Sequence, residues 1–159
     1  MKNDSDIIIR PNIRYWIIRI IPYVFLETLI IYIVNLFNLN DYIIGSCTLV
    51  VFFSIFYKYL SILLCTKWII TKEQIKIYSG VFNKSINYIE LYRVYDYEEK
   101  RSFILSLIQC TNVYIHSGDK STPILAIYGI NRNIDLIGII RKRVERQKQI
   151  KSIYEFTNR

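Results

Sequence analysis

Apolar residues are concentrated in two long runs, residues 16–37 and 42–65, which together fill most of residues 15–65. A helix needs about 20 mostly apolar residues to cross roughly 30 Å of hydrocarbon, and each run is long enough. Two helices that are apolar on every side need a large surrounding protein if they are to be buried in a soluble core. The pattern therefore predicts two transmembrane helices.

The polar break at residues 38–41 is short, so the two helices are expected to be antiparallel neighbours that form a hairpin. Cationic residues flank the outer ends of the hairpin but are missing from the break: Arg10, Arg14, Arg19, Lys67 and Lys72. The positive-inside rule then places both termini in the cytoplasm, with the chain in the inner (cytoplasmic) membrane as a multi-pass protein. Tyr15, Trp16 and Trp68 lie where an aromatic belt is expected.

Two ionisable residues interrupt the predicted membrane segments, Glu27 in the first and Lys58 in the second. Such groups are costly in hydrocarbon, and they usually pair or face protein. One hypothesis is an intramembrane Glu27–Lys58 ion pair that sets the helix register. A second is that Lys58 snorkels while Glu27 is protonated or contacts another subunit, and a third is a proton or ion pathway.

After residue 66 the long apolar runs give way to short alternating ones, which is typical of β-strands. A short helix is predicted at residues 102–108. The predicted strands cover residues 68–71, 74–78, 84–89, 94–97, 112–116 and 124–128.

The last predicted element is an amphipathic helix. Asn131 or Asn133 is the expected cap, and the apolar stripe consists of Ile134, Ile137, Ile140 and Val144. Strands followed by one helix indicate an α+β domain, an antiparallel β-sandwich or barrel capped by a C-terminal helix. The predicted organisation is a cytoplasmic tether (1–14), a hairpin (15–65), a domain (66–145) and a basic tail (146–159).

The net charge of +8 is concentrated after the hairpin. Residues 1–65 contain five cations and four acids, a net of +1, so the remainder carries 8 − 1 = +7. A basic surface beside an anionic leaflet favours headgroup contact, although a solvated helix face explains the same charges. No nucleic-acid-binding motif accompanies them. The candidate headgroup contacts are Arg141, Lys142, Arg143, Arg146 and Lys148.

No catalytic or cofactor-binding pattern is visible. The single histidine, His116, rules out a multi-histidine metal site within one chain. Asp96, Glu98 and Glu99 form an acidic cluster that is expected to be a solvated strand end. Three irregularly spaced cysteines are expected to be reduced packing residues: Cys47, Cys65 and Cys110. The chain is expected not to be an enzyme and to need no cofactor or metal.

Two stretches resemble bacterial pleckstrin-homology-like (PH-like, or YdbS-like) membrane proteins. Residues 70–82 are similar to that family's strand–turn–strand, which ends in a Gly before an apolar pair. Residues 89–94 are similar to its I-P-L-x-R-I stretch, with Glu90 in place of the usual Pro, and residues 105–110 lack the family's Leu-Gly turn. The resemblance implies a PH-like fold and a bacterial inner-membrane location.

These observations favour a membrane-anchored interaction module that binds a protein partner, anionic lipid headgroups, or both. The alternative is a small transport or lipid-handling subunit in which Glu27 and Lys58 matter. Membrane lipids and an unknown membrane or cytoplasmic protein are the expected partners. A second copy of the chain is also a candidate, and nucleic acid is not expected.

Overall fold

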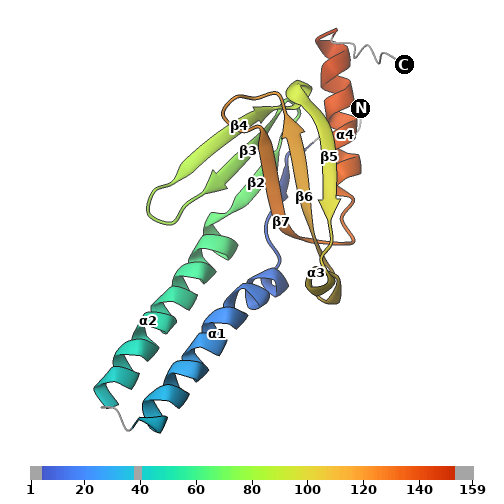
Figure 1. Cartoon of the computed structure of the whole chain (residues 1–159). Coiled ribbons are helices and arrows are strands. Elements are labelled where there is room, and N and C mark those ends of the chain that lie inside the picture. The colour runs from blue at the N-terminus through green and yellow to red at the C-terminus, as the bar shows by residue number, and fades with distance from the viewer. Residues whose placement is uncertain (1–4, 38–40, 153–159) are drawn as a thin grey trace.

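The computed structural model describes residues 5–37 and 41–152, and Figure 1 shows a helical hairpin that projects from a β-rich domain. The hairpin consists of α1 (Ile13–Leu36), α2 (Asp41–Tyr59) and η1 (Leu60–Cys65), a π-helical continuation of α2. Asn12 caps α1, because its side chain accepts a hydrogen bond from the Arg14 amide. The predicted break at residues 38–40 lies outside the described residues.

Two helices of the hairpin are long and apolar enough to cross a membrane. Ile13–Leu36 has a mean hydropathy of 2.1 and Ile44–Cys65 a mean of 1.9, each over its most apolar window. Only 6% of each window is buried. Neither helix is therefore the core helix of a soluble domain, which buries most of its apolar surface.

The first sheet is antiparallel, with the strand order β1-β2-β3-β4. Its strands are β1 (Ile7–Ile9), β2 (Lys67–Ile70), β3 (Gln74–Ser79) and β4 (Ser85–Glu90). Strand β1 was not predicted. It lies in the segment assigned to a tether, and it pairs Ile8 with Ile69 of β2. Three consecutive isoleucines do not alternate with polar residues, so periodicity alone did not indicate a strand.

The second sheet is also antiparallel, with the order β5-β6-β7. The 3-10 turn η2 (Leu91–Arg93) leads from the first sheet into β5 (Val94–Lys100), and β6 (Cys110–Ser117) and β7 (Ile124–Asn131) follow. The predicted short helix is present as α3 (Phe103–Leu107) between β5 and β6, capped by Ser102.

The hydrophobic core lies between the two sheets and under α4 (Leu136–Ile150). Each sheet contributes alternate residues of its strands, as expected for one buried face per sheet. The largest fully buried side chains come from both sheets, η2 and α4: Ile70, Ile75, Ile89, Leu91, Ile115, Ile127, Ile130, Leu136 and Ile140. This arrangement confirms the predicted α+β fold of antiparallel strands with a C-terminal helix.

The start of α4 differs from the prediction. Asp135 is the cap, and its Oδ1 accepts a hydrogen bond from the Gly138 amide at 2.9 Å. Asn131 instead accepts a bond from the Asn133 amide within the preceding turn. The buried face of α4 consists of Leu136, Ile140, Val144 and Gln147. Ile134 lies before the helix and is exposed, because the helix begins later than the apolar pattern suggested.

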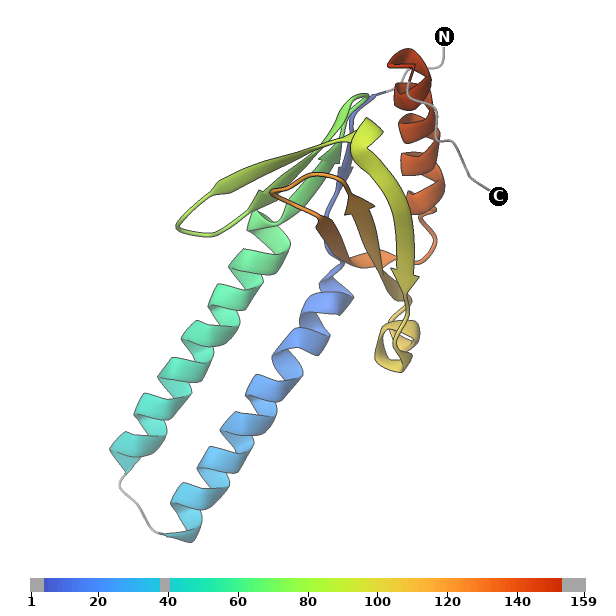
Figure 2. The ribbon, with the colours of Figure 1, turned by 45° about the horizontal axis from the view of Figure 1, so that its top comes forward.

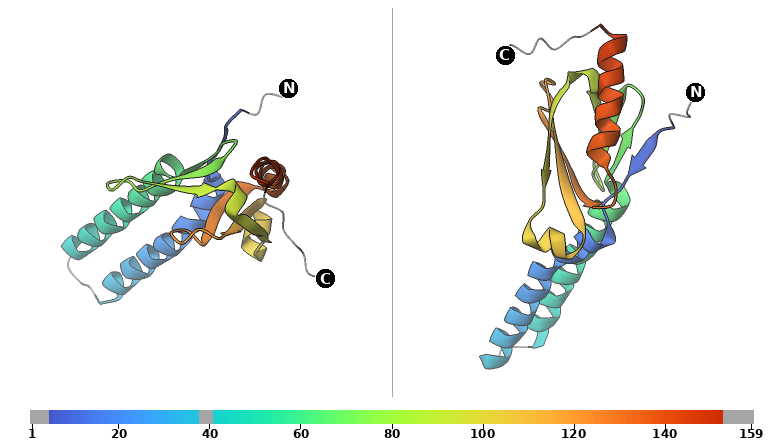
Figure 3. Two further views of the ribbon diagram at one scale, coloured as in Figure 1. Left: turned by 90° about the horizontal axis from the view of Figure 1, so that it is seen from above. Right: turned by 90° about the vertical axis from the view of Figure 1, so that its right-hand side faces the viewer.

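The domain has two distinct ends, which Figures 1 and 2 show from two directions. The hairpin end is where α1 and η1 enter the domain, with α3 beside the first turns of α1. At the far end lie the last turns of α4, which runs away from the hairpin (Figure 3, right). Helix α4 extends to Ile150, beyond the predicted domain boundary at residue 145.

Candidate functional site

The hairpin is joined to the domain by a small second core. Its buried members are Tyr15, Leu105 and Cys110, which come from α1, α3 and β6. The Asn12 amide donates to the Gly129 carbonyl at 2.8 Å, and the Tyr15 ring stacks on Tyr128 with the centroids 6.3 Å apart. Packing and hydrogen bonds from several elements therefore set the orientation of the domain relative to the hairpin.

Gly129 is essential to this contact. Its φ is +63°, a left-handed backbone conformation that residues other than glycine rarely adopt. A Cβ at this position would overlap the Tyr15 ring. The close approach of β7 to α1 therefore requires glycine here.

A groove opens at the junction, and we call it the junction groove. Its volume is about 280 Å³, and it is lined by Pro11, Tyr15, Arg19, Lys58, Ile62, Thr66, Trp68 and Tyr128. Two cations from different helices, Arg19 of α1 and Lys58 of α2, therefore share one groove. Arg19 donates to the Tyr15 hydroxyl from Nη2 at 2.6 Å and from Nε at 3.0 Å.

No carboxylate neutralises these two cations. The lining of the junction groove contains no Asp or Glu, and no ion pair among the described residues involves Arg19 or Lys58. Burial, together with Tyr114 and Tyr15, raises the pKa of the Tyr128 phenol above its ordinary value, so this hydroxyl stays neutral and adds no negative charge. The groove is therefore suited to an anion.

The hypothesised Glu27–Lys58 ion pair is not formed in the described structure. Both carboxylate oxygens of Glu27 are buried without a hydrogen-bond partner. Lys58 instead lines a groove together with Tyr23 of α1. Tyr23 lies four residues before Glu27, which places it about 6 Å nearer the domain along α1. Among the described residues, Lys58 therefore contacts no carboxylate.

Apolar side chains protrude on both sides of the hairpin. In the β3–β4 turn, Phe82 is 86% exposed, and its ring stacks on Tyr57 of α2 at 6.3 Å between centroids. On the other side, α3 exposes Phe103, Ile104 and Leu107. Arg14 ties the end of α3 to α1 through a hydrogen bond to the Gln109 side chain at 3.1 Å. The hairpin end of the domain thus presents an apolar rim around the helices.

The five cations predicted to contact headgroups lie on α4, which runs toward the far end (Figure 3, right). Arg143 is occupied within the fold. Its guanidinium donates to the carbonyls of Ile70 at 2.6 Å, Thr71 at 2.9 Å and Ser5 at 2.8 Å. It therefore stabilises the packing of α4 on β2 and on the segment before β1. Lys142 and Arg146 are exposed on α4.

A second groove lies between β5 and α4, and we call it the β5–α4 groove. It measures about 280 Å³ and is lined by Val94, Tyr95, Asp96, Tyr97, Arg141, Val144, Glu145 and Lys148. Strand β5 is the edge of its sheet. The Arg141 guanidinium lies over the Tyr97 ring, 5.6 Å from its centroid. Two of the predicted headgroup contacts, Arg141 and Lys148, thus line this groove.

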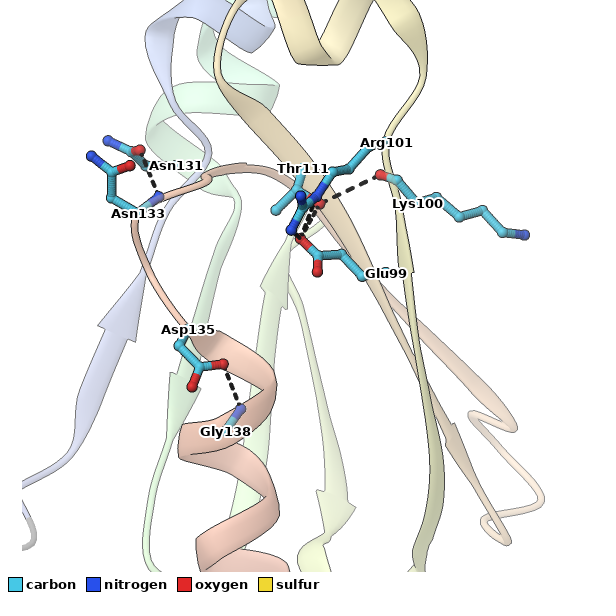
Figure 4. Close-up of polar contacts among 8 residues, drawn as sticks. All are labelled: Glu99, Lys100, Arg101, Thr111, Asn131, Asn133, Asp135 and Gly138. Atoms are coloured by element: carbon cyan, nitrogen blue, oxygen red, sulfur yellow. Dashed lines mark hydrogen bonds and ion pairs between the residues drawn. The ribbon is translucent and has the colours of Figure 1, made fainter.

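A polar cleft of about 190 Å³ lies where β5 and β6 meet the start of α4, and Figure 4 shows its contacts. The Glu99 carboxylate accepts hydrogen bonds from Thr111 Oγ1 and Arg101 Nη2, both at 2.8 Å. Burial raises the pKa of Glu99, but these hydrogen bonds and the charges of Arg101 and Arg132 outweigh it, so the pKa lies below its ordinary value. The hydrogen bond between Glu99 and Thr111 connects β5 to β6 at this cleft.

The remaining candidate groups lie apart from the grooves described above. Cys47, Cys65 and Cys110 are free thiols, and burial raises the pKa of Cys110. His116 lies on β6 with its ring 6.3 Å from that of Tyr95. Glu98 pairs with Lys100 at 3.2 Å. In the described part of the chain, no group of three or more His, Cys, Asp or Glu residues is placed to hold a metal ion.

The sequence indicated Lys58 as notable but not the groove in which it lies. Tyr15 and Tyr128 are far apart in the chain, and only the docking of β7 on α1 brings them together. The four-residue spacing of Tyr15 and Arg19 was the available signal, since it places both side chains on one face of a helix.

Comparison with known proteins gives one finding. Neither the curated proteins nor the solved structures provide a match. The model of the family described as the bacterial PH domain matches residues 17–149, which include most of α1, all of α2 and η1, all strands of the domain except β1, and nearly all of α4. Because this match covers most of the chain and agrees with the fold, the chain belongs to the bacterial PH domain family.

Proposed function

We propose that this protein is a membrane-anchored interaction module. Its hairpin crosses the cytoplasmic membrane twice, and its PH-like domain binds a protein partner on the cytoplasmic side. The proposal rests on the way the hairpin joins the domain. The contacts of α1 with α3, β6 and β7 orient the domain so that the β5–α4 groove faces away from the hairpin. A PH-like domain is a scaffold for binding, but fold alone does not define a partner.

Two features support the membrane part of the proposal. The surfaces of both hairpin helices are apolar and almost wholly unburied, which water disfavours. The apolar rim formed by Phe82 and α3 flanks the helices on two sides near the domain. Phe82 lies beside Tyr57, eight residues before the end of η1, or about 12 Å along the helix. At that depth an aromatic side chain is suited to the membrane interface.

The β5–α4 groove supports the protein-binding part. An edge strand offers unpaired backbone groups to an added strand, and neighbouring pockets then select side chains. Tyr95 is 62% exposed on β5. The groove contains both signs of charge, with Asp96 and Glu145 beside Arg141 and Lys148. An extended peptide segment that carries both charges fits this lining better than an anionic headgroup does.

Photo-crosslinking in native membranes tests the proposal. A photoreactive amino acid in place of Tyr95 is expected to capture a specific protein. The matched control is the same substitution at Tyr88, which is 49% exposed on β4 of the other sheet. Equal capture at both positions, or capture by a hairpin that carries an unrelated soluble domain, would contradict binding at the β5–α4 groove.

One observation favours the alternative of a transport or lipid-handling subunit, and that is the unpartnered Glu27 carboxylate within the hairpin. In hydrocarbon such a group needs a partner, a proton or another subunit. Loss of function on Glu27→Gln, with normal accumulation and unchanged Tyr95 crosslinks, is the result that would favour this alternative. Association with a second copy would appear as a Glu27-dependent change in oligomeric state.

A further inference from the structure

The junction groove shares Lys58 with an apolar groove that α1 and α2 line. This inter-helix groove measures about 440 Å³ and is lined by Tyr23, Val50, Phe53, Ser54, Tyr57 and Lys58. We propose that the two grooves together hold one anionic phospholipid, with its phosphate between Arg19 and Lys58 and an acyl chain along the inter-helix groove. The inference rests on the membrane anchoring proposed above and adds a ligand to the hairpin end.

The spacing of the lining residues indicates that the two grooves are continuous. Tyr15, Arg19 and Tyr23 are four residues apart on α1, and Ser54, Lys58 and Ile62 repeat the same spacing on α2 and η1. Residues four apart lie on one face of a helix. Lys58 lines both grooves, so a ligand that leaves the junction groove at Lys58 enters the apolar one directly.

The depths of the two cations agree. Arg19 is six residues into α1 from Ile13, and Lys58 is seven residues before the end of η1 at Cys65. At 1.5 Å per residue these positions are about 9 Å and about 10 Å from the domain. Because α1 and α2 are neighbours that run in opposite directions, the two charges face the same layer of the membrane.

The charges of the site identify the ligand class. Arg19 and Lys58 have no carboxylate partner in the part of the chain that the structure describes, and a cation at this depth is costly unless it reaches a counter-charge. A phosphate supplies that charge and accepts hydrogen bonds from guanidinium and ammonium groups. The Tyr15 hydroxyl accepts bonds from Nε and Nη2 of Arg19, which limits the orientations of the guanidinium. The apolar groove beyond Lys58 favours a lipid over a free phosphate ion.

Native mass spectrometry of the full chain in detergent tests this site. Phosphatidylglycerol and phosphatidylcholine with the same acyl chains are added separately, and the wild type is expected to retain phosphatidylglycerol preferentially. Arg19→Gln and Lys58→Gln are each expected to weaken this binding about fivefold, the equivalent of about 1 kcal/mol per cation near a membrane surface. Lys58→Arg should retain binding, because it keeps the charge.

Two further variants separate a defined site from general attraction. Lys142→Gln removes an exposed cation on α4 and should leave retention unchanged. Val50→Trp fills the inter-helix groove and should weaken retention severalfold while both cations remain. A near-unchanged circular dichroism spectrum shows that each variant is folded.

Three results would overturn the inference. They are equal retention of the two lipids, a loss in Lys142→Gln as large as that in Lys58→Gln, and displacement of the lipid by equimolar inorganic phosphate. None of these would change the crosslinks at Tyr95, which test the proposed function. Conversely, release of the chain from membranes by an alkaline carbonate wash would contradict the proposed anchoring, whatever lipid is retained in detergent.

Discussion

The far end and the hairpin end of the domain both contain arginines, and the two ends use them differently. Arg143 donates to three backbone carbonyls, from β2, from the turn after it and from the segment before β1. Arg19 makes its hydrogen bonds to one hydroxyl, that of Tyr15, and faces a groove without carboxylates. An arginine's role therefore depends on whether the fold already occupies its hydrogen-bond donors.

The same comparison applies to apolar surface. Around α4 the apolar residues Leu136, Ile140 and Val144 are buried in the core. At the hairpin end Phe82 and the outer side of α3 are exposed. Exposed apolar surface that continues onto apolar helices is typical of a site of protein or membrane contact, and contact with the membrane is the function proposed for it above. The apolar face of α4 is thus buried within the domain, while apolar side chains at the hairpin end remain available for contact.

The largest effect is expected from breaking the junction with Gly129→Ala. The new Cβ would overlap the Tyr15 ring, and alanine at a positive φ is strained by roughly 1–2 kcal/mol. Overpacking adds typically 1–3 kcal/mol, so the total loss of stability is about 3 kcal/mol. Thermal unfolding in detergent measures it. The control is Gly118→Ala, where the nearest atom is 3.9 Å away, and equal melting temperatures for the two variants would argue against a tight junction.

A smaller loss is expected from Arg143→Met, which tests the structural role of this arginine at the far end. Methionine keeps much of the aliphatic length but leaves the carbonyls of Ile70, Thr71 and Ser5 without their donor. Losing hydrogen bonds to a charged group costs about 2 kcal/mol. Lys142→Met is the neighbouring control and should change stability by less than about 0.5 kcal/mol. If lipid retention falls while stability is unchanged, Arg143 acts as a headgroup contact after all.

The smallest effect is expected from Glu99→Gln in the polar cleft. The pKa of Glu99 is lower in the folded protein than in the unfolded chain, so its contribution is present above the unfolded pKa. It is lost as the pH falls through the folded pKa. The contribution is less than about 1 kcal/mol, because the carboxylate is partly solvated. The variant should therefore show a weaker acid-induced fall in melting temperature, whereas Glu98→Gln, which removes a surface pair with Lys100, should resemble the wild type.

Local pattern was sufficient for most elements of the fold. Six of the seven strands, α3 and α4 agree with the predictions, because alternation and helical spacing depend only on neighbouring residues. Strand β1 was missed because its three isoleucines do not alternate. The cap of α4 was misplaced because several polar residues precede the helix, and only the backbone course shows that Asp135 reaches the free amide of Gly138.

The candidate sites were less predictable than the elements. Lys58 was noted from its position in an apolar run, and Arg141 and Lys148 from a cluster of charge. The sequence did not show that Arg19 and Tyr128 share a groove with Lys58, nor that Arg141 lies over Tyr97. Such groupings join residues from distant segments, and no local spacing specifies them.

By itself the sequence determined two helices long and apolar enough to cross a membrane, an α+β domain of antiparallel strands, and its resemblance to the bacterial PH family. Each depends on the order of apolar and polar residues along a short stretch of chain. Packing between distant segments was needed to show that Arg143 donates to three backbone carbonyls, that Glu27 and Lys58 form no ion pair among the described residues, and that a groove with two cations forms at the junction. The physical reason is that hydrogen bonds and charge pairing depend on distances between segments, which packing establishes.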